Sequence, residues 1–540
     1  MNRKFLFVLF SIFWTINVIN AGDFSYLYKD LPFDMPVLKK PTFPDNTVNI
    51  IDFEGMPDGV TLNTKAFAKA MNALAAEGGG TLLVPSGVWY TGPIVFQSNI
   101  NLHLEKGALI LFSSDTKQYP LIQTVFEGLD TYRCQSPISG INLTNIAITG
   151  EGSINGSGEA WRPLKQEKVT AGHWQRVVKS GGVVRNGNFW YPSAGALKGA
   201  EMSDMNVPRG LETEEQWEEV KDFLRPVMVS FVGCKNVLLE GVLFENSPSW
   251  NVHPLMCENV ILDGVFIRNP GYAQNGDGLD LESCKNAIII NSTFDVGDDA
   301  ICLKSGKDAD GRKRGRPTEN VIVDNCKVFQ GHGGFVVGSE MSGGVRNVSV
   351  KNCLFIGTDV GLRFKSCRGR GGVVENIYIE KINMTNITTE PLLFDLYYWS
   401  KLTPEAIIAE EAKPVPAVDE TTPAFRNIYI KDLVARNASR AMFFNGIPEQ
   451  NIDNINLENV SISATLGAEL YESSNINFKN VKIVPKEGAA LKLRNVKNFS
   501  MTDFEFPETL EKAIKVSGTT SKNIELPKTI AENKIERINK

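Results

Sequence analysis

Short stretches in which apolar and polar residues alternate recur along most of this chain. Each copy begins with an asparagine, continues as an alternating stretch, and passes through a Gly, Asn or Asp turn into a second apolar stretch. The copies begin at Asn236, Asn259, Asn286, Asn320, Asn347, Asn376, Asn427, Asn454, Asn475 and Asn498, with an earlier relative from Gly140. Alternation with a period of two predicts β-strands, and most copies lie 21 to 29 residues apart, as in a solenoid. The pattern therefore predicts an all-β chain folded as a parallel β-helix, with the leading asparagines stacked as a ladder of amides.

Two segments depart from the repeat. Residues 62–77 have apolar residues at helical spacing, with Asn63 or Thr64 as the cap, so we expect an amphipathic helix that covers the open end of the solenoid. Residues 156–224 form an aromatic-rich insertion, in which Thr213 and Gln216 predict a capped helix. An insertion of this length is usually functional.

The first residues have the pattern of a secretory signal peptide, predicted at residues 1–21. Basic residues at positions 3 and 4 precede an apolar run, Phe5 to Ile19, and small residues at Ala21 and Gly22. The alternative, a membrane anchor, is disfavoured because the run is short for a membrane span. We expect an exported protein, periplasmic or extracellular, in which residues 22–540 form one β-helix domain with no membrane span.

Composition sets limits on function. Of the 540 residues, 42% are hydrophobic and 22% are charged, which is ordinary for a soluble protein and excludes wholesale disorder. The net charge of -6 argues against a nucleic-acid partner, because phosphate neutralisation needs a basic surplus. At about 150 residues per domain the length would suggest three or four domains, but the repeat replaces that count with one solenoid.

Five of the eight cysteines follow the repeat. Cys234, Cys257 and Cys284 each precede a ladder asparagine by two positions, and Cys326 and Cys353 each follow one by six. This register predicts small buried residues stacked between coils and leaves disulfide formation open.

Four further strands align without gaps between the repeated phrases, starting at Gly278, Ala300, Gly334 and Gly361. Alternation turns their leucine, isoleucine and phenylalanine side chains inward and their polar side chains outward. The outward side chains include Asp280, Glu282, Lys304, Arg363 and Lys365, with His253 one coil before Asp280. We expect them to form one exposed polar sheet face.

Acidic residues gather where these strands begin. The register places Asp277 and Asp299 at equivalent positions on adjacent coils, about 4.8 Å apart. Asp298 is one residue earlier than Asp299, and His332 occupies the matching position one coil later. Like charges this close raise at least one pKa, which gives a site an acid and a base together. Taken singly these residues are as well explained by solvated turns, but their shared register predicts a catalytic site.

These residues carry a resemblance to a known family. The series NGD (Asn275–Asp277), GDD (Gly297–Asp299), GHG (Gly331–Gly333) and RFK (Arg363–Lys365) resembles the four signatures of glycoside hydrolase family 28, the polygalacturonase family. The resemblance spans residues 48–460. It departs from the family pattern at Gly276, where the family has Thr, and at Phe364, where the family has Ile. Phe364 faces inward by register, so its effect should be on packing.

The resemblance implies a right-handed, pectin-lyase-like β-helix of an exported bacterial protein that hydrolyses α-1,4-galacturonide linkages with inversion. Asp298 would be the general acid, Asp277 and Asp299 would hold and deprotonate the attacking water, and His332 would tune Asp298. Substrate contacts are expected from Arg363, Lys365, Lys304, Asn275, Asp280 and His253. The expected partner is a pectic polysaccharide or oligogalacturonide, with no metal or organic cofactor, and the protein is expected to be a monomer.

Basic residues also cluster near this site, and two readings of them stay open. The run from 304 to 316 is either a solvated loop or a wall that binds substrate carboxylates. The members of the wider cluster are Lys304, Lys307, Arg312, Lys313, Arg314, Arg316, Arg363, Lys365, Arg368 and Arg370. Together with the 156–224 insertion, the 304–319 loop is expected to close one end of the cleft, which favours exo action.

Three other functions compete with this interpretation. A rhamnogalacturonan or xylogalacturonan hydrolase of the same family would share the four signatures. A pectate-type lyase would share the fold but would need calcium-binding carboxylates and a strong base. A non-catalytic β-helical carbohydrate-binding protein would show no turnover at all.

Overall fold

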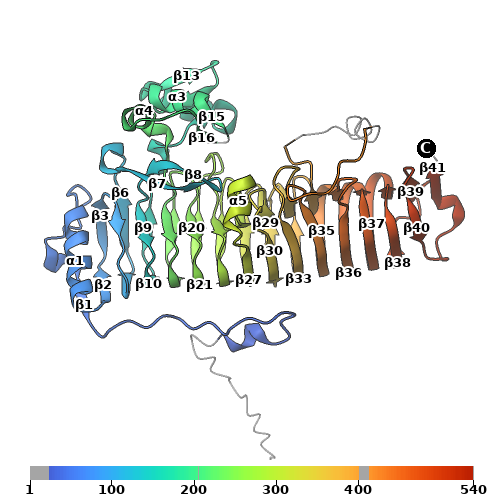
Figure 1. The fold of residues 1–540 in the computed structure, drawn as a ribbon, viewed down its shortest axis with the longest axis horizontal. Helices are drawn as coiled ribbons and strands as arrows, with labels where there is room; N and C mark the ends of the chain where they lie inside the picture. Colours follow the sequence, from blue (N-terminus) through green and yellow to red (C-terminus); the bar gives the residue numbers. More distant parts are fainter. Residues whose placement is uncertain (1–23, 205, 400–412, 539–540) are drawn as a thin grey trace, which may run out of the picture.

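The computed structural model describes residues 24–204, 206–399 and 413–538, and these form a long parallel β-helix (Figure 1). Successive coils pair strand to strand in parallel, which confirms the predicted solenoid. The predicted signal peptide lies outside the described residues. Within the described ranges no helix is long and apolar enough to cross a membrane.

The strands form three parallel ladders. The first contains β1 (Thr47–Asn49), β2 (Gly80–Val84), β5 (Ile100–Leu104), β10 (Thr144–Gly150), β18 (Lys235–Glu240), β21 (Glu258–Asp263), β24 (Lys285–Ile290), β27 (Thr318–Asp324), β30 (Val345–Lys351) and β33 (Val373–Thr385). The second contains β3 (Gly87–Thr91), β6 (Ala108–Phe112), β11 (Ser153–Asn155), β19 (Leu243–Glu245), β22 (Phe266–Arg268), β25 (Thr293–Asp295), β28 (Lys327–Phe329) and β31 (Leu354–Ile356). The third contains β4 (Ile94–Val95), β9 (Ile138–Ile141), β17 (Val229–Val232), β20 (Val252–Leu255), β23 (Leu279–Glu282), β26 (Asp299–Lys304), β29 (Gly333–Gly338), β32 (Val360–Lys365) and β34 (Leu392–Asp395).

The last coils contain three longer strands that continue around the corners between ladders, β35 (Ala424–Asn445), β36 (Ile452–Tyr471) and β37 (Ser473–Arg494). Shorter strands follow them, β38 (Lys497–Glu505), β39 (Ile514–Ser517), β40 (Lys522–Glu525) and β41 (Ile535–Ile538).

The asparagine ladder is confirmed. The Asn259 amide donates to the side-chain oxygen of Asn236 at 2.9 Å, and Asn286 donates to Asn259 at 3.1 Å. Each of these residues has a positive φ, for example 58° at Asn236, a conformation that asparagine tolerates better than most residues. Asparagine therefore suits this position for two reasons: it tolerates the backbone conformation, and its amide stacks on the neighbouring amide.

The inward positions are filled as predicted. Leu279, Ile301, Phe335 and Leu362 are buried in the core, and the Phe364 ring stacks on Phe394 with a centroid distance of 4.6 Å. All eight cysteines lie in the described ranges as free thiols, and seven of them are buried.

The predicted end cap is α1 (Thr64–Ala76), which lies across the N-terminal end of the solenoid (Figure 1). Residues 24–46 run along the outside of the first ladder, where Phe24, Leu27 and Leu38 pack on outward apolar side chains such as Leu238 and Ile261. The sequence pattern did not predict this strap.

The 156–224 insertion stands on one side of the β-helix, next to the hairpin of β7 (Leu121–Phe126) and β8 (Leu129–Cys134) (Figure 1). It contains β12 (Leu164–Lys165), α2 (Ala171–Lys179), β13 (Val183–Arg185), β14 (Phe189–Tyr191), α3 (Ala194–Met202), β15 (Ser203–Asp204), β16 (Val207–Pro208) and α4 (Glu214–Glu219). The predicted capping box of Thr213 and Gln216 is present at the start of α4. The 304–319 loop forms a further helix, α5 (Asp308–Arg314).

Candidate active site

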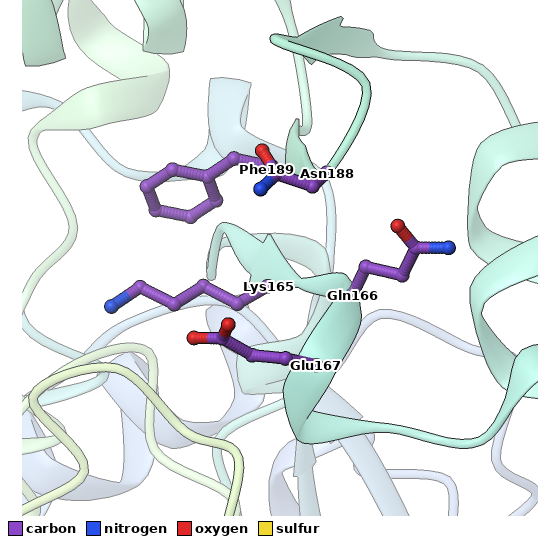
Figure 2. Close-up of a pocket in the computed structure, with 5 residues that line it drawn as sticks. All are labelled: Lys165, Gln166, Glu167, Asn188 and Phe189. Atoms are coloured by element: carbon purple, nitrogen blue, oxygen red, sulfur yellow. The ribbon is translucent and has the colours of Figure 1, made fainter.

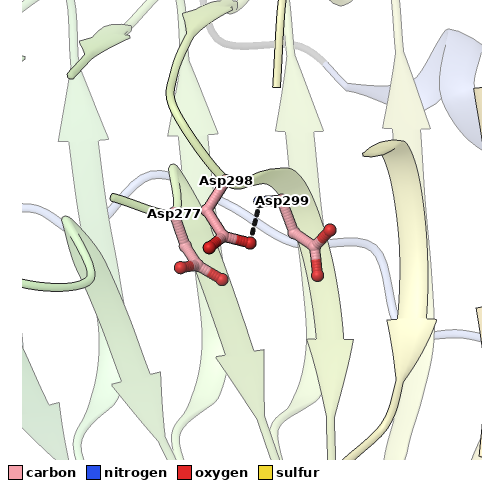
Figure 3. Close-up of side chains that lie close together, drawn as sticks. All are labelled: Asp277, Asp298 and Asp299. Carbon is pink, nitrogen blue, oxygen red and sulfur yellow. Dashed lines mark hydrogen bonds between the residues drawn. The ribbon is translucent and has the colours of Figure 1, made fainter. Parts of the chain in front are cut away.

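Three aspartates meet where two adjacent strands of the third ladder begin (Figure 3). Asp277 lies just before β23, and Asp298 and Asp299 stand at the start of β26. The pairing of Leu279 with Ile301 sets Asp277 beside Asp299. One carboxylate oxygen from each of the three aspartates lies within 4.8 Å of the others. The structure thus brings together the carboxylates that the register placed at one edge.

Asp298 differs from its neighbours in its access to solvent. Its side chain is 22% exposed, against 4% for Asp277 and 1% for Asp299. His332 Nδ1 lies 3.2 Å from Asp298 Oδ1, and the Asp299 backbone amide donates to the same oxygen at 2.9 Å. Asp298 is therefore the member of the trio that a bound substrate reaches most directly.

The electrostatics separate Asp277 from Asp298. Burial raises the pKa of Asp277 well above its ordinary value, and the charges of Asp298 and Asp280 raise it further. Burial also acts to raise the pKa of Asp298, but the hydrogen bond and charge of His332 outweigh it, so this pKa lies below its ordinary value. Burial thus favours the neutral form of Asp277, whereas the family resemblance gives the acid role to Asp298.

Two cations hold Asp299. Arg363 Nη1 lies 3.0 Å from Oδ1, and Lys365 Nζ lies 2.6 Å from Oδ2. Burial acts to raise the pKa of Asp299, but the charges of Lys365 and Arg363 outweigh it and lower the pKa. The Tyr398 ring lies 5.6 Å from the Arg363 guanidinium and 5.0 Å from the Lys365 ammonium. The two predicted carboxylate-binding cations are thus paired with Asp299 in the free protein.

Lys304 is buried among carboxylates, so the prediction that Lys304 and Asp280 lie exposed to substrate is wrong. The Lys304 ammonium lies 3.2 Å from Asp280, 3.3 Å from Glu340 and 3.9 Å from Asp277. It also lies 3.8 Å from the centroid of the Trp250 ring. Burial raises the pKa of Asp280 to about 7. The outward direction was predicted correctly, but other segments cover this part of the face.

His253 and Asn275 also have internal partners, and the burial of His253 corrects its assignment as a substrate contact. His253 is 2% exposed, and its Nε2 lies 2.9 Å from Glu282, a buried carboxylate that also accepts from Arg314 at 2.7 Å. The Asn275 side-chain oxygen accepts from Arg225 Nη2 at 2.8 Å. Asn275 thus fixes the loop that leads to the aspartates.

The arginines of the basic cluster are largely used within the protein. Arg370 pairs with Asp308 at the start of α5, and Arg368 pairs with Glu449. These two arginines of the wider cluster therefore each have a carboxylate of the chain as partner.

Two residues of the site were missed. Asp359 occupies the register position that follows His332, and its carboxylate lies 3.9 Å from His332 Nε2. The register could have found Asp359, whereas Glu340 lies just after β29, where no repeat position marks it. Trp250 occupies the position of Asp277 one coil earlier.

The close spacing of the three carboxylates also raises the question of a metal ion. Both oxygens of Asp299 already accept from cations, and His332 lies against Asp298. A divalent ion would compete with these positive charges, so the donor set is a poor match for a metal.

Gly276 occupies a position with no room for a side chain. A Cβ at Gly276 would lie 2.6 Å from the Ala273 Cβ. The family's Thr does not fit this loop, so the departure at Gly276 accompanies a local change of loop packing.

The His332 pair predicts a pH dependence of stability. The hydrogen bond and charge of Asp298 raise the pKa of His332. Protonated His332 therefore stabilises the fold below the unfolded pKa of about 6.5, and this contribution is lost as the pH rises through the raised value. We expect His332→Gln to remove this part of the fall in melting temperature between about pH 6 and pH 9. Identical melting profiles for His332→Gln and the wild type would contradict the pairing.

Comparisons with known proteins agree with this geometry. Residues 214–482 match the family Glycosyl hydrolases family 28. The chain is 30% identical over 427 residues to a probable polygalacturonase of Vitis vinifera, covering 77% of this chain and 74% of that protein. It is 27% identical over 452 residues to an exo-poly-alpha-D-galacturonosidase of Dickeya chrysanthemi, covering 81% of this chain and 71% of that protein.

The solved structures agree in the same way. The hyperthermoactive exopolygalacturonase of Thermotoga maritima is similar with a TM-score of 0.66 and 32% identity, covering 87% of this chain and 94% of that one. These similarities confirm the predicted fold class.

Proposed function

Because this chain belongs to glycosyl hydrolase family 28, we propose that it hydrolyses the α-1,4-galacturonide linkages of pectin or polygalacturonate and acts at chain ends. The relatives named polygalacturonase support the substrate, and those named exo-acting support the end preference. The observation that carries the reaction is the meeting of three carboxylates, one of them solvent-accessible and paired with His332.

The family resemblance implies a single displacement. Asp298 gives its proton to the leaving oxygen as the glycosidic bond breaks, and water held by Asp277 and Asp299 attacks the anomeric carbon and loses its proton to them. The carboxylate oxygens lie within 4.8 Å of one another, so one water can bridge Asp277 and Asp298 and pass a proton between them.

An aromatic wall supports exo action. Trp250, at the Asp277 position of the preceding coil, stacks on Phe126 of the β7–β8 hairpin at 4.8 Å, and both are 1% exposed. The Arg133 guanidinium covers the other side of Phe126 at 3.8 Å. On the side of the N-terminal coils, the position next to Asp277 is therefore occupied by a wall of packed side chains. A polymer chain that continued in this direction would have to pass this wall.

The opposite direction offers an exposed aromatic surface. Trp399 is 45% exposed beside Tyr398 and can contact a sugar chain. A wall on one side and an exposed aromatic ring on the other fit removal of terminal residues.

Incubation with polygalacturonate tests the reaction class and its stereochemistry. We expect new reducing ends without an unsaturated, ultraviolet-absorbing product; such a product would indicate a lyase, and no turnover would indicate a binding protein. Faster cleavage of rhamnogalacturonan or xylogalacturonan would favour those activities.

The first product should have the inverted, β configuration by NMR. An α product would contradict inversion. The test is decisive because inverting enzymes usually separate two carboxyl groups by about 6.5–9.5 Å, whereas the carboxylate oxygens here lie within 4.8 Å of one another.

We also infer that the protein is exported and acts as a monomer. The basic and apolar N-terminal pattern supports export. Deletion of residues 2–21 tests export, and we expect the protein to disappear from the exported fraction. Size-exclusion chromatography of the purified protein tests the oligomeric state, and we expect the elution volume of a monomer.

A further inference from the structure

The 156–224 insertion contains a small antiparallel sheet with two unlike faces. The sheet consists of β12, β14 and β13 in that order. On one face Leu164 pairs with Trp190, and both are buried in a cluster with Trp174 against which Tyr272 packs. Tyr272 belongs to the loop that leads to Asp277, so this face anchors the sheet beside the catalytic loop.

The other face carries a cation, an aromatic ring and a second cation in one row. The register pairs Phe189 with Lys165 on one side and with Arg185 on the other. The Lys165 ammonium lies 5.8 Å from the centroid of the Phe189 ring (Figure 2). Adjacent strands are about 4.8 Å apart, so the two cations flank the ring closely. Arg185 is exposed, and its guanidinium lies 3.9 Å from Glu201.

A hollow of about 340 Å³ adjoins this row, and its walls combine apolar and polar groups. It is lined by Lys165, Gln166, Glu167, Asn188 and Phe189 (Figure 2). The volume lies at the lower end of the range of about 300–1,000 Å³ that is typical of small-molecule sites. The half-buried Phe189 ring suits the apolar face of a sugar, and the exposed amides of Gln166 and Asn188 suit its hydroxyl groups.

We propose that this hollow is a second saccharide-binding site, separate from the catalytic aspartates, that takes an acidic oligosaccharide. Charge complementarity selects a uronate, because Lys165 and Arg185 flank the surface on which a sugar ring stacks. The identification of this oligosaccharide as oligogalacturonide rests on the proposed function. Such a site would hold a long polymer near the groove and would leave short substrates unaffected. Glu167 is the one acidic residue in the lining, and its charge opposes binding.

The test compares Lys165→Met and Phe189→Leu with the wild type in the full chain. On polygalacturonate we expect KM to rise about 2- to 5-fold, the effect of one exposed charge interaction, while kcat and the rate on digalacturonate stay unchanged. Glu167→Gln should lower KM at low salt. The matched control is Lys179→Met, which removes an exposed lysine at the end of α2 and should change neither substrate. An unchanged KM on the polymer, or an equal loss on both substrates, would overturn the proposal.

A binding measurement separates this proposal from the proposed function. In a native gel containing polygalacturonate, the wild type should be retarded more than Lys165→Met, whether or not the protein hydrolyses the polymer. Equal retardation of Lys165→Met and the wild type would overturn the second site. Retardation by a neutral galactan of the same length would overturn the assignment to a uronate.

Discussion

Asp298→Asn lowers kcat on polygalacturonate by about 10²- to 10⁴-fold, the usual contribution of a general acid. The amide keeps the shape of the side chain but has no acidic proton for the leaving oxygen. The fold should be unaffected, because Asp298 is the most exposed member of the trio. Release of reducing ends at saturating substrate measures the effect, and Asp503→Asn, a change at an exposed position of β38 remote from the site, serves as the matched control.

The same experiment decides between two assignments of the acid. The family resemblance assigns the acid role to Asp298, whereas burial favours the neutral form of Asp277. If Asp298→Asn keeps more than a tenth of the wild-type kcat while Asp277→Asn is inactive, Asp277 is the acid and the proposed transfer is wrong.

Lys304→Met lowers the free energy of unfolding by about 3–5 kcal/mol, the usual cost of removing one partner of a buried ion pair. The ammonium lies among three buried carboxylates, those of Asp280, Glu340 and Asp277. Methionine fills a similar volume but removes the positive charge from this cluster. Denaturant unfolding followed by tryptophan fluorescence measures the loss, and activity should fall with it, because Asp277 would then hold its proton more tightly.

A double variant shows whether charge or packing causes this loss. Lys304→Met combined with Asp280→Asn also removes one of the carboxylates that lose their cation, and should recover part of the free energy of unfolding. If Lys304→Met unfolds at the wild-type denaturant concentration, the buried carboxylates are neutralised by other groups. If the double variant is no better than the single one, the loss comes from packing against Trp250.

The fold could be predicted because each copy of the repeat carries its own strand pattern and its own leading asparagine. The Asn236 and Asn259 positions recur with the register of their coils, and the inward Leu279 and Ile301 follow from alternation alone. The meeting of Asp277 with Asp299 needed only that register. The strap at residues 24–46 could not be predicted in this way, because its partners Leu238 and Ile261 lie far away in the sequence.

The burial of the polar face could not be predicted for the same reason. Alternation fixes the direction in which His253 and Lys304 point, but it does not say what covers them. The cover comes from contacts between distant segments, such as Phe126 on Trp250 and Arg314 on Glu282. His253 and Lys304, which were expected to contact substrate, therefore pair with buried carboxylates inside the protein.

The product sizes released from polygalacturonate over time test the central claim most directly. Cleavage at chain ends by the three aspartates predicts galacturonate, or another product of one fixed small size, from the earliest sample, while the polymer keeps most of its length. A ladder of intermediate oligomers in the first samples, with a rapid fall in viscosity, would show cleavage within the chain and contradict the wall formed by Phe126 and Trp250.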